Sequence, residues 1–223
     1  LEFETFLSIS PNKFSIYLIE TKNKKILYQK DYSFENEYTS NNFNNLDKFL
    51  KKNIFKIEKL IKKFVKNIFL IIEHEKIINH LIGIKKKNIN TKYITNAVTE
   101  VKDLFKENYQ NEKIMHMVVT KYIINEKIFT TFENNLYCDE LSLEIQFRSI
   151  SENTIRNLDK VLETFQIKII RYLDGYYIRN YFNDENLEIS KMSHQIIKGS
   201  NKNEVALVPK NMKKIGFFEK FFQ

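Results

Sequence analysis

Glycine and proline are scarce in this chain, and their scarcity limits the loops that it can build. Its 223 residues include 4 glycines, 2 prolines and 1 cysteine. Long flexible linkers and glycine-rich phosphate-binding loops are therefore almost excluded. The single Cys138 excludes an internal disulfide and suits a reducing compartment. Because the sequence places no histidine beside it, we expect a buried thiol and not a nucleophile.

Long apolar runs are also absent. No stretch reaches the roughly 18–20 apolar residues that a membrane-spanning helix needs. The longest uninterrupted run, residues 68–72, predicts a buried strand. No signal peptide is recognisable, and because the chain starts without Met we expect a few residues to be missing at its start.

Aromatic and basic side chains are abundant. Phenylalanine (19) and tyrosine (12) supply much of a hydrophobic fraction of 43%, which is enough for one domain or two small ones. The net charge of +8 and the pI near 9.2 would suit nucleic acid or acidic lipid. The lysines are spread along the chain, however, and we interpret the clusters at 51–52, 62–63 and 85–87 mostly as solvated faces.

Hydrophobic periodicity predicts an alternation of strands and helices. Apolar residues three and four positions apart give helix 46–65 a core face that includes Leu60 and Phe64, and helix 91–109 one that includes Leu104 and Phe105. Two further helices are predicted at residues 151–165 and 173–182, and beyond Asn183 the periodicity is lost. Period-two alternation and β-forming runs predict strands at residues 6–10, 14–19, 25–32, 68–72, 76–84, 113–124, 141–149 and 166–172.

This order of elements resembles the N-terminal half of FtsA, the actin-like bacterial cell-division protein. Four local matches carry the resemblance: the strand at 69–72, the helix at 94–105, the apolar strand around His116, and an Asn-x-x-Lys helix at 157–162 followed by the strand 167–169. The pilus-assembly protein PilM shares this architecture and is an alternative. The resemblance implies an α+β fold, a truncated actin-like (ribonuclease-H-like) subdomain with an inserted strand-helix-strand-strand subdomain.

The resemblance also implies a division of the chain. Residues 1–84 would form the first part of a subdomain like 1A of FtsA, and residues 85–165 an inserted subdomain like its 1C. The chain would return to the first subdomain at 166–185. Residues 186–210 are predicted to be a linker, and residues 211–223 an amphipathic C-terminal helix.

The departures from the family pattern concern nucleotide binding. The family has an Asp-x-Gly-type turn between its first two strands, where a carboxylate organises a metal-bound water and glycine admits phosphate. Here that turn, Ser8 to Lys13, contains neither Asp nor Gly. No counterpart of the second phosphate loop is present, and the residues after Phe182 are too few for subdomains 2A and 2B, where the family docks the FtsZ tail. By resemblance we expect no ATP binding, no cofactor and no such docking.

No residue set predicts catalysis or metal binding. His74 and His80 lack a Cys or Asp partner at ligand spacing, and His116 is expected to be a satisfied structural histidine. The adjacent acids at 139–140 and 184–185 lie in turns, and adjacent side chains on a strand point to opposite faces. We therefore expect a binding protein and not an enzyme, with no catalytic, cofactor or metal residues.

The C-terminal stretch is the strongest candidate for a functional surface. On a helical wheel its apolar residues share one broad face and its lysines flank that face, as in helices that lie in a membrane surface. The alternative is that this helix packs on the protein's own core. FtsA also ends in a membrane-targeting helix. The predicted membrane-binding residues are Met212, Lys213, Lys214, Ile215, Phe217, Phe218, Lys220, Phe221 and Phe222.

The resulting hypothesis is a non-catalytic divisome adaptor on the cytoplasmic face of the inner membrane. The inserted subdomain would bind other division proteins or a second copy of the chain, and the C-terminal helix would bind an anionic membrane surface. The alternatives are a PilM-like pilus or secretion scaffold and a basic nucleic-acid-binding protein. The last lacks a helix-turn-helix or aromatic-stacking motif, so no specific nucleic acid is expected.

Overall fold

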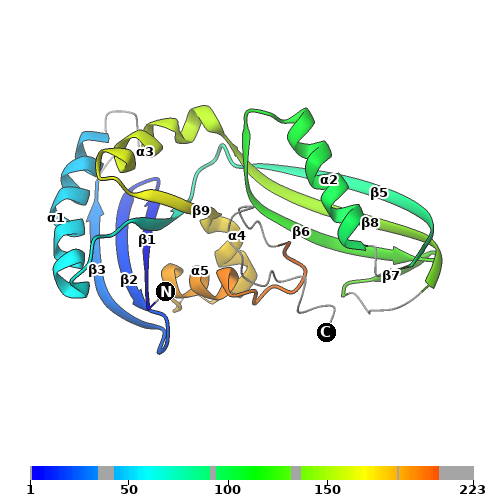
Figure 1. Cartoon of the computed structure of the whole chain (residues 1–223), viewed down its shortest axis with the longest axis horizontal. Helices are drawn as coiled ribbons and strands as arrows, with labels where there is room; N and C mark the ends of the chain where they lie inside the picture. The colour runs from blue at the N-terminus through cyan, green and yellow to red at the C-terminus, as the bar shows by residue number, and fades with distance from the viewer. Residues whose placement is uncertain (1, 35–42, 91–93, 132–136, 185, 206–223) are drawn as a thin grey trace. The chain divides into compact units, whose positions relative to one another are not determined.

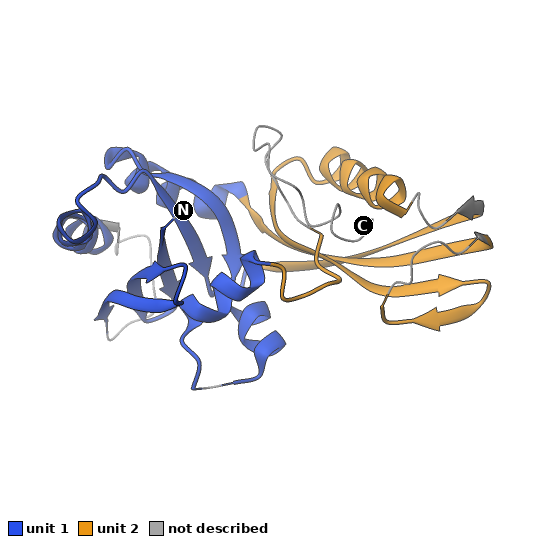
Figure 2. Ribbon diagram, turned by 60° about the horizontal axis from the view of Figure 1, so that its bottom comes forward, with its two compact units in different colours: residues 1–76, 152–198 blue, residues 77–151, 199–223 orange. Residues whose placement is uncertain are grey.

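A computed structural model describes residues 2–34, 43–90, 94–131, 137–184 and 186–205 of the chain (Figure 1). Within these ranges the chain forms two compact units (Figure 2). Unit 1 contains residues 2–76 and 152–198, and unit 2 contains residues 77–151 and 199–205. No helix among the described residues has the length and apolar content needed to cross a membrane.

Unit 1 is built on a five-stranded sheet with the strand order β3-β2-β1-β4-β9. Strand β2 is antiparallel to β1 and β3, whereas β1 runs parallel to β4 and β4 runs parallel to β9. This order, with one reversed strand, is the ribonuclease-H-like arrangement, and the predicted fold class is confirmed. The strands are β1 (Phe3–Ser10), β2 (Lys13–Glu20), β3 (Lys25–Ser33), β4 (Asn67–Ile72) and β9 (Lys168–Asp174).

Helices cover both faces of this sheet. On one face, the rings of Phe14 in β2 and Phe49 in α1 (Phe43–Ile61) lie 6.2 Å apart, and α3 (Glu152–Thr164) packs beside α1. On the other face lie α4 (Gly175–Phe182) and α5 (Ile189–Ile197). Strands β1 and β2 are therefore buried at six consecutive positions each. The cluster on the second face contains Phe6, Tyr17, Ile19, Phe69, Ile71, Leu173, Ile178, Ile189, Met192 and Ile196.

Helix α5 corrects the prediction of a linker at residues 186–210. Its Ile189, Met192 and Ile196 follow helical spacing and are buried against the sheet. The apolar spacing is hard to recognise in the sequence because polar residues of the same turns, such as His194, are buried beside the apolar ones. Nδ1 of His194 lies 2.6 Å from a carboxylate oxygen of Glu4 in β1, so the polar group is paired inside unit 1.

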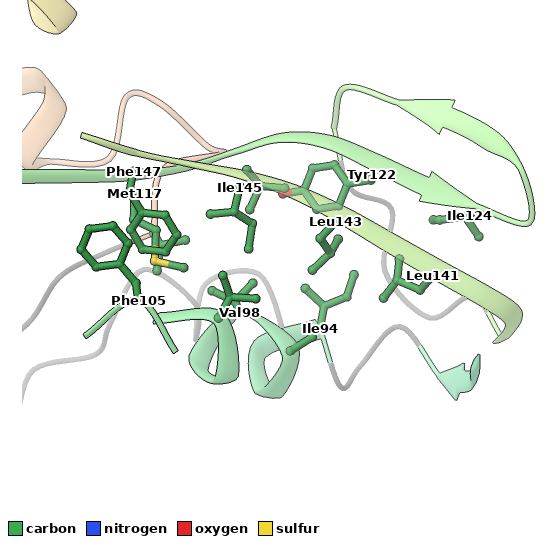
Figure 3. Packing of buried hydrophobic residues seen from close by; sticks show 14 of the residues in the cluster. Ile94, Val98, Phe105, Met117, Tyr122, Ile124, Leu141, Leu143, Ile145 and Phe147 are labelled. Carbon is green, nitrogen blue, oxygen red and sulfur yellow. The ribbon is translucent and has the colours of Figure 1, made fainter. Parts of the chain in front are cut away.

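Unit 2 is an antiparallel sheet with the order β5-β8-β6-β7 and one helix, α2 (Ile94–Asn108), on one face. The strands are β5 (Ile78–Asn90), β6 (Glu112–Ile124), β7 (Lys127–Phe129) and β8 (Tyr137–Ser151). The helix buries Ile94, Val98 and Phe105 against alternate residues of β8 and β6 (Figure 3). The rings of Phe105 and Phe147 stack with centroids 4.4 Å apart. The three-residue β7 was not predicted, because so short a strand carries almost no periodicity.

The boundaries of the inserted unit differ from the predicted 85–165. Ile78 at the start of β5 pairs with Ser149 near the end of β8, so pairing closes unit 2 at both ends. Helix α3 follows directly and belongs to unit 1. Residues 203–205, placed in the predicted linker, pair with β6: the N–H of Val119 donates to Asn203 O at 2.9 Å, and the N–H of Val205 donates to Met117 O at 2.8 Å.

Three residues predicted to lie in the core, Leu60, Phe64 and Leu104, are exposed, whereas Phe105 and Cys138 are buried as predicted. Leu104 is 48% exposed because it lies at the edge of the apolar stripe of α2, whereas Phe105 is fully buried. Leu60 is exposed although it lies in the last turn of α1. Phe64 is exposed because α1 ends at Ile61 and Lys62 takes a left-handed φ of 54°. Cys138 is buried as expected, and burial raises the pKa of its thiol.

The neighbouring positions 104 and 105 form a matched pair for a stability test. Phe105→Ala should lower the free energy of unfolding by ~3–5 kcal/mol, as truncation of a fully buried aromatic ring does. Leu104→Ala should cost less than ~1 kcal/mol because half of that side chain is already in water. Urea unfolding followed by circular dichroism measures both, and equal losses would contradict the observed face of α2.

Candidate functional site at the carboxyl edge of the unit 1 sheet

The carboxyl ends of three parallel strands meet at one edge of the unit 1 sheet. Strand β1 ends at Ser10, β4 at Ile72 and β9 at Asp174. Open sheets with parallel strands bind ligands at this edge. A cavity of about 210 Å³ opens here. It is lined by Ile9, Ser10, Pro11, Glu73, His74, Glu75 and Tyr176.

The turn between β1 and β2 is a tight one. Ser10 pairs with Lys13, so Pro11 and Asn12 alone connect the strands. The Ser10 hydroxyl donates to the carbonyl of Lys13 at 3.2 Å. Proline has no N–H, so this turn offers few backbone donors to a phosphate. This turn, which lacks the Asp and Gly of the family pattern, therefore lies at the edge where a ligand would bind.

Glu73, the first residue after β4, is paired within the protein. Its carboxylate accepts from Nε of Arg179 in α4 at 2.7 Å, and its backbone N–H donates to Ile9 O at 2.9 Å. A Cβ on Gly175 would overlap Cγ of Glu73, so a larger residue where α4 begins would force the Glu73 side chain to move. The Glu73 carboxylate is thus held by a cation of the same unit.

Asp174 at the end of β9 caps helix α4. Its buried carboxylate accepts from the backbone N–H groups of Tyr176 at 2.9 Å and Tyr177 at 3.2 Å. These N–H groups have no partner within the helix, and a side-chain oxygen at the cap satisfies them. Two of the acidic groups at this edge therefore stabilise the fold.

His74 and Glu75 contribute the remaining polar groups of the cavity. Nδ1 of His74 accepts from the backbone N–H of Lys76 at 3.0 Å. Burial and the nearby charge of Lys76 lower the pKa of the His74 imidazole, which is therefore neutral at pH 7 with its proton on Nε2. The cavity thus presents carboxylates, the hydroxyls of Ser10 and Tyr176, and one neutral imidazole.

This arrangement suits a small polar or cationic group better than a nucleotide. The described lining of the cavity includes two carboxylates and no lysine or arginine, so a polyphosphate would meet repulsion. Its volume is below the roughly 300–1,000 Å³ of typical ligand sites. In the part of the chain that the structure describes, no group of three or more His, Cys, Asp or Glu side chains could hold a metal ion.

Two of the other histidines are paired inside unit 2. Nε2 of His80 lies 2.9 Å from Glu112 Oε2, and its ring lies against Tyr109 with centroids 4.3 Å apart. His116 is fully buried, with Nδ1 at 2.7 Å from Glu204 Oε1. His116 is thus the satisfied structural histidine that the sequence predicts.

Sequence reasoning missed Glu73, Gly175 and Arg179. A usable signal was present, because Glu73 directly follows the apolar run of β4 and Gly175 directly follows β9. The predicted membrane-binding residues 212–222 lie outside the described residues, so that assignment stays a prediction.

Comparison with known proteins yields no family. No protein-family model and no curated protein matches the chain. Among solved structures, the cytoplasmic domain of EpsL, an inner-membrane component of the type II secretion system of Vibrio cholerae, matches at 7% identity with a TM-score of 0.39, covering 79% of this chain and 58% of that one. The PilM–PilN type IV pilus biogenesis complex matches at 8% identity with a TM-score of 0.49, covering 81% and 49%.

A third solved structure is a Bacteroides thetaiotaomicron protein with an actin-like ATPase fold and unknown function. It matches at 15% identity with a TM-score of 0.33, covering 81% of this chain and 55% of that one. The chain thus spans between 49% and 58% of the three solved chains. At TM-scores below 0.5, these likenesses assign neither a family nor an activity.

The close approach of Gly175 and Glu73 can be tested by a double-mutant cycle. Gly175→Ala should lower the free energy of unfolding by about 1–3 kcal/mol, because the new methyl group overlaps the Glu73 side chain. In a Glu73→Ala background the same change should cost less than ~0.5 kcal/mol, since the overlapping atoms are gone. Thermal or urea unfolding of the four proteins measures the coupling, and additive losses would contradict the packing described.

Proposed function

We propose that this chain is a non-catalytic protein-binding scaffold of a membrane-associated assembly. The observation that carries the proposal is the Glu73–Arg179 pair beside a tight, proline-containing turn, at the edge where a ribonuclease-H-like sheet would bind its ligand. The acidic groups at this edge stabilise the protein itself, and the cavity is small and unsuited to phosphate. The same edge therefore supports a structural role more than a catalytic one.

Unit 2 supplies a surface suited to a protein partner. Strand β5 has 13 residues and pairs with β8 on one side, and among the described residues no strand pairs with its other side. Two large apolar side chains on it are exposed, Leu81 at 62% and Ile78 at 43%. An exposed edge strand of this length can take an extended peptide by strand addition, with backbone hydrogen bonds for affinity and side chains for specificity.

The assembly itself has two candidates. One is a pilus or secretion platform, and the other is the cell-division apparatus implied by the resemblance to FtsA. The solved structures named above include a secretion component and a pilus complex, and none of the three is described as a cell-division protein. We therefore place the pilus or secretion platform ahead of cell division as the first role to test. Attachment to the membrane through residues 212–222 is part of this proposal.

The proposal predicts that the protein does not bind ATP. Isothermal titration with Mg-ATP should give no heat of binding above dilution. The physical reasons are the missing carboxylate and glycine of the first turn and the carboxylates of the cavity. Micromolar affinity would contradict the proposal.

Site-specific photo-crosslinking tests the free edge of β5. A photoreactive amino acid at Leu81 should crosslink a defined protein in cells, because this side chain is exposed on the edge strand β5. The same amino acid at Ile128, which is 66% exposed on β7, serves as the matched control. Mass spectrometry that finds a pilus, secretion or division component at position 81 but not at 128 supports the proposal. Identical products at both positions would exclude a specific edge.

A further inference from the structure

The solvent face of α1 carries a row of lysines. Lys48, Lys52, Lys56 and Lys59 are spaced by four, four and three residues, which places them on one side of the helix. All four are exposed. Sequence reasoning treated part of this row as an ordinary solvated face. Two features of the structure distinguish this row from an ordinary solvated helix face.

The first feature is that no described acid pairs with these four lysines. Asp47 pairs with Lys51 at 2.8 Å, and the carboxylate of Glu58 accepts from the backbone N–H of Val65 at 3.0 Å. No ion pair joins the four lysines to any acid among the described residues. Lysines four positions apart repel one another and weaken a helix unless an anion lies nearby.

Strand β3 adds to the same charged region. A cavity of about 390 Å³ between β3 and α1 is lined by Lys30 together with Lys48, Lys52 and Lys56. Among the described residues that line it, Asp31 is the one acid. The region therefore has a net positive charge over two elements of unit 1.

The second feature is a set of large apolar side chains beside the lysines. Phe55 is 69% exposed on the same helix, Leu60 is 57% exposed, and Phe64 is 80% exposed in the turn that follows. Phe64 is left outside because the helix ends at Ile61, and Val65 fills the core in its place with 6% exposure. Lys62, Lys63 and Lys66 are exposed around Phe64.

We propose that this face of unit 1, defined by Lys48, Lys52, Lys56, Lys59, Phe55, Leu60 and Phe64, docks on an anionic lipid surface. Lysine ammonium groups bind headgroup phosphates, and the apolar side chains enter the boundary between headgroups and acyl chains. The exposed aliphatic Leu60 favours a lipid surface over nucleic acid, since bases stack on aromatic rings. This surface is separate from residues 212–222, so it does not depend on the proposed C-terminal attachment.

The expected effect follows from the charge. Each lysine near an anionic surface contributes about a fivefold factor in binding, so three of them contribute roughly 100-fold. Lys52→Gln/Lys56→Gln/Lys59→Gln in the full chain should therefore weaken co-sedimentation with vesicles of phosphatidylcholine and phosphatidylglycerol by roughly this factor. A matched control is Lys87→Gln/Lys106→Gln/Lys127→Gln, three exposed lysines of unit 2, which should bind like the unaltered chain.

Tryptophan fluorescence tests the apolar part of the surface. The chain contains no tryptophan, so Phe55→Trp gives a single reporter on this face and Leu81→Trp a control in unit 2. With anionic vesicles the emission of the Phe55→Trp variant should shift to shorter wavelength and be quenched by brominated lipid. The emission of the Leu81→Trp variant should not change.

The outcomes separate this proposal from the C-terminal one. Phe217→Ser/Phe221→Ser in the full chain tests the C-terminal residues alone. If only that variant loses vesicle binding, or if the α1 and control lysine variants lose it equally, the α1 surface is overturned. If the unaltered chain does not sediment with anionic vesicles, both membrane surfaces are overturned. If the α1 variant instead loses affinity for a single-stranded oligonucleotide and vesicles are not bound, the surface binds nucleic acid and the lipid proposal falls.

Discussion

The parallel pairing of β4 with both β1 and β9 is the constraint on which the rest of the structure depends. Parallel neighbours cannot be joined by a tight turn, so the chain must leave the sheet after Ile72 and return at Lys168. Within unit 2, Ile78 pairs with Ser149, so the inserted unit begins and ends at adjacent positions. A large insertion can therefore fold on its own pairing, and α3 alone completes the crossover to β9.

Hydrophobic periodicity predicted those helices and strands that bury one well-defined face against the rest of the protein. Phe105 lies in the middle of such a face, whereas Leu104 at its edge could not be assigned from spacing alone. Phe64 continues the apolar spacing of α1, but the helix ends before it at Lys62. Helix α5 was missed because its paired His194 and buried serines disguise an apolar face. In each case tertiary contacts decided what the spacing left open.

The contact between the groups at the carboxyl edge could not be found from any local pattern. Glu73 and Arg179 are 106 positions apart and meet because β4 and β9 are neighbours in the sheet. The sequence did predict that the first turn lacks the residues of a phosphate loop. It did not predict that the Glu73 carboxylate would pair with Arg179 or that the Asp174 carboxylate would cap α4. The edge retains the topology of a ligand site while its polar groups serve the fold.

The contact between Glu4 and His194 joins residues 190 positions apart. Strand β1 is synthesised first, but the helix that covers one of its faces is synthesised near the end. At ~5–20 residues per second, roughly 10–40 s separate the two on the ribosome. During that interval the second face of the unit 1 sheet, including Phe6 and Tyr17, has no cover, while the strands of unit 2 can already pair. The strands that are made first thus complete their sheet and its second cover only after residues 168–197 have been made.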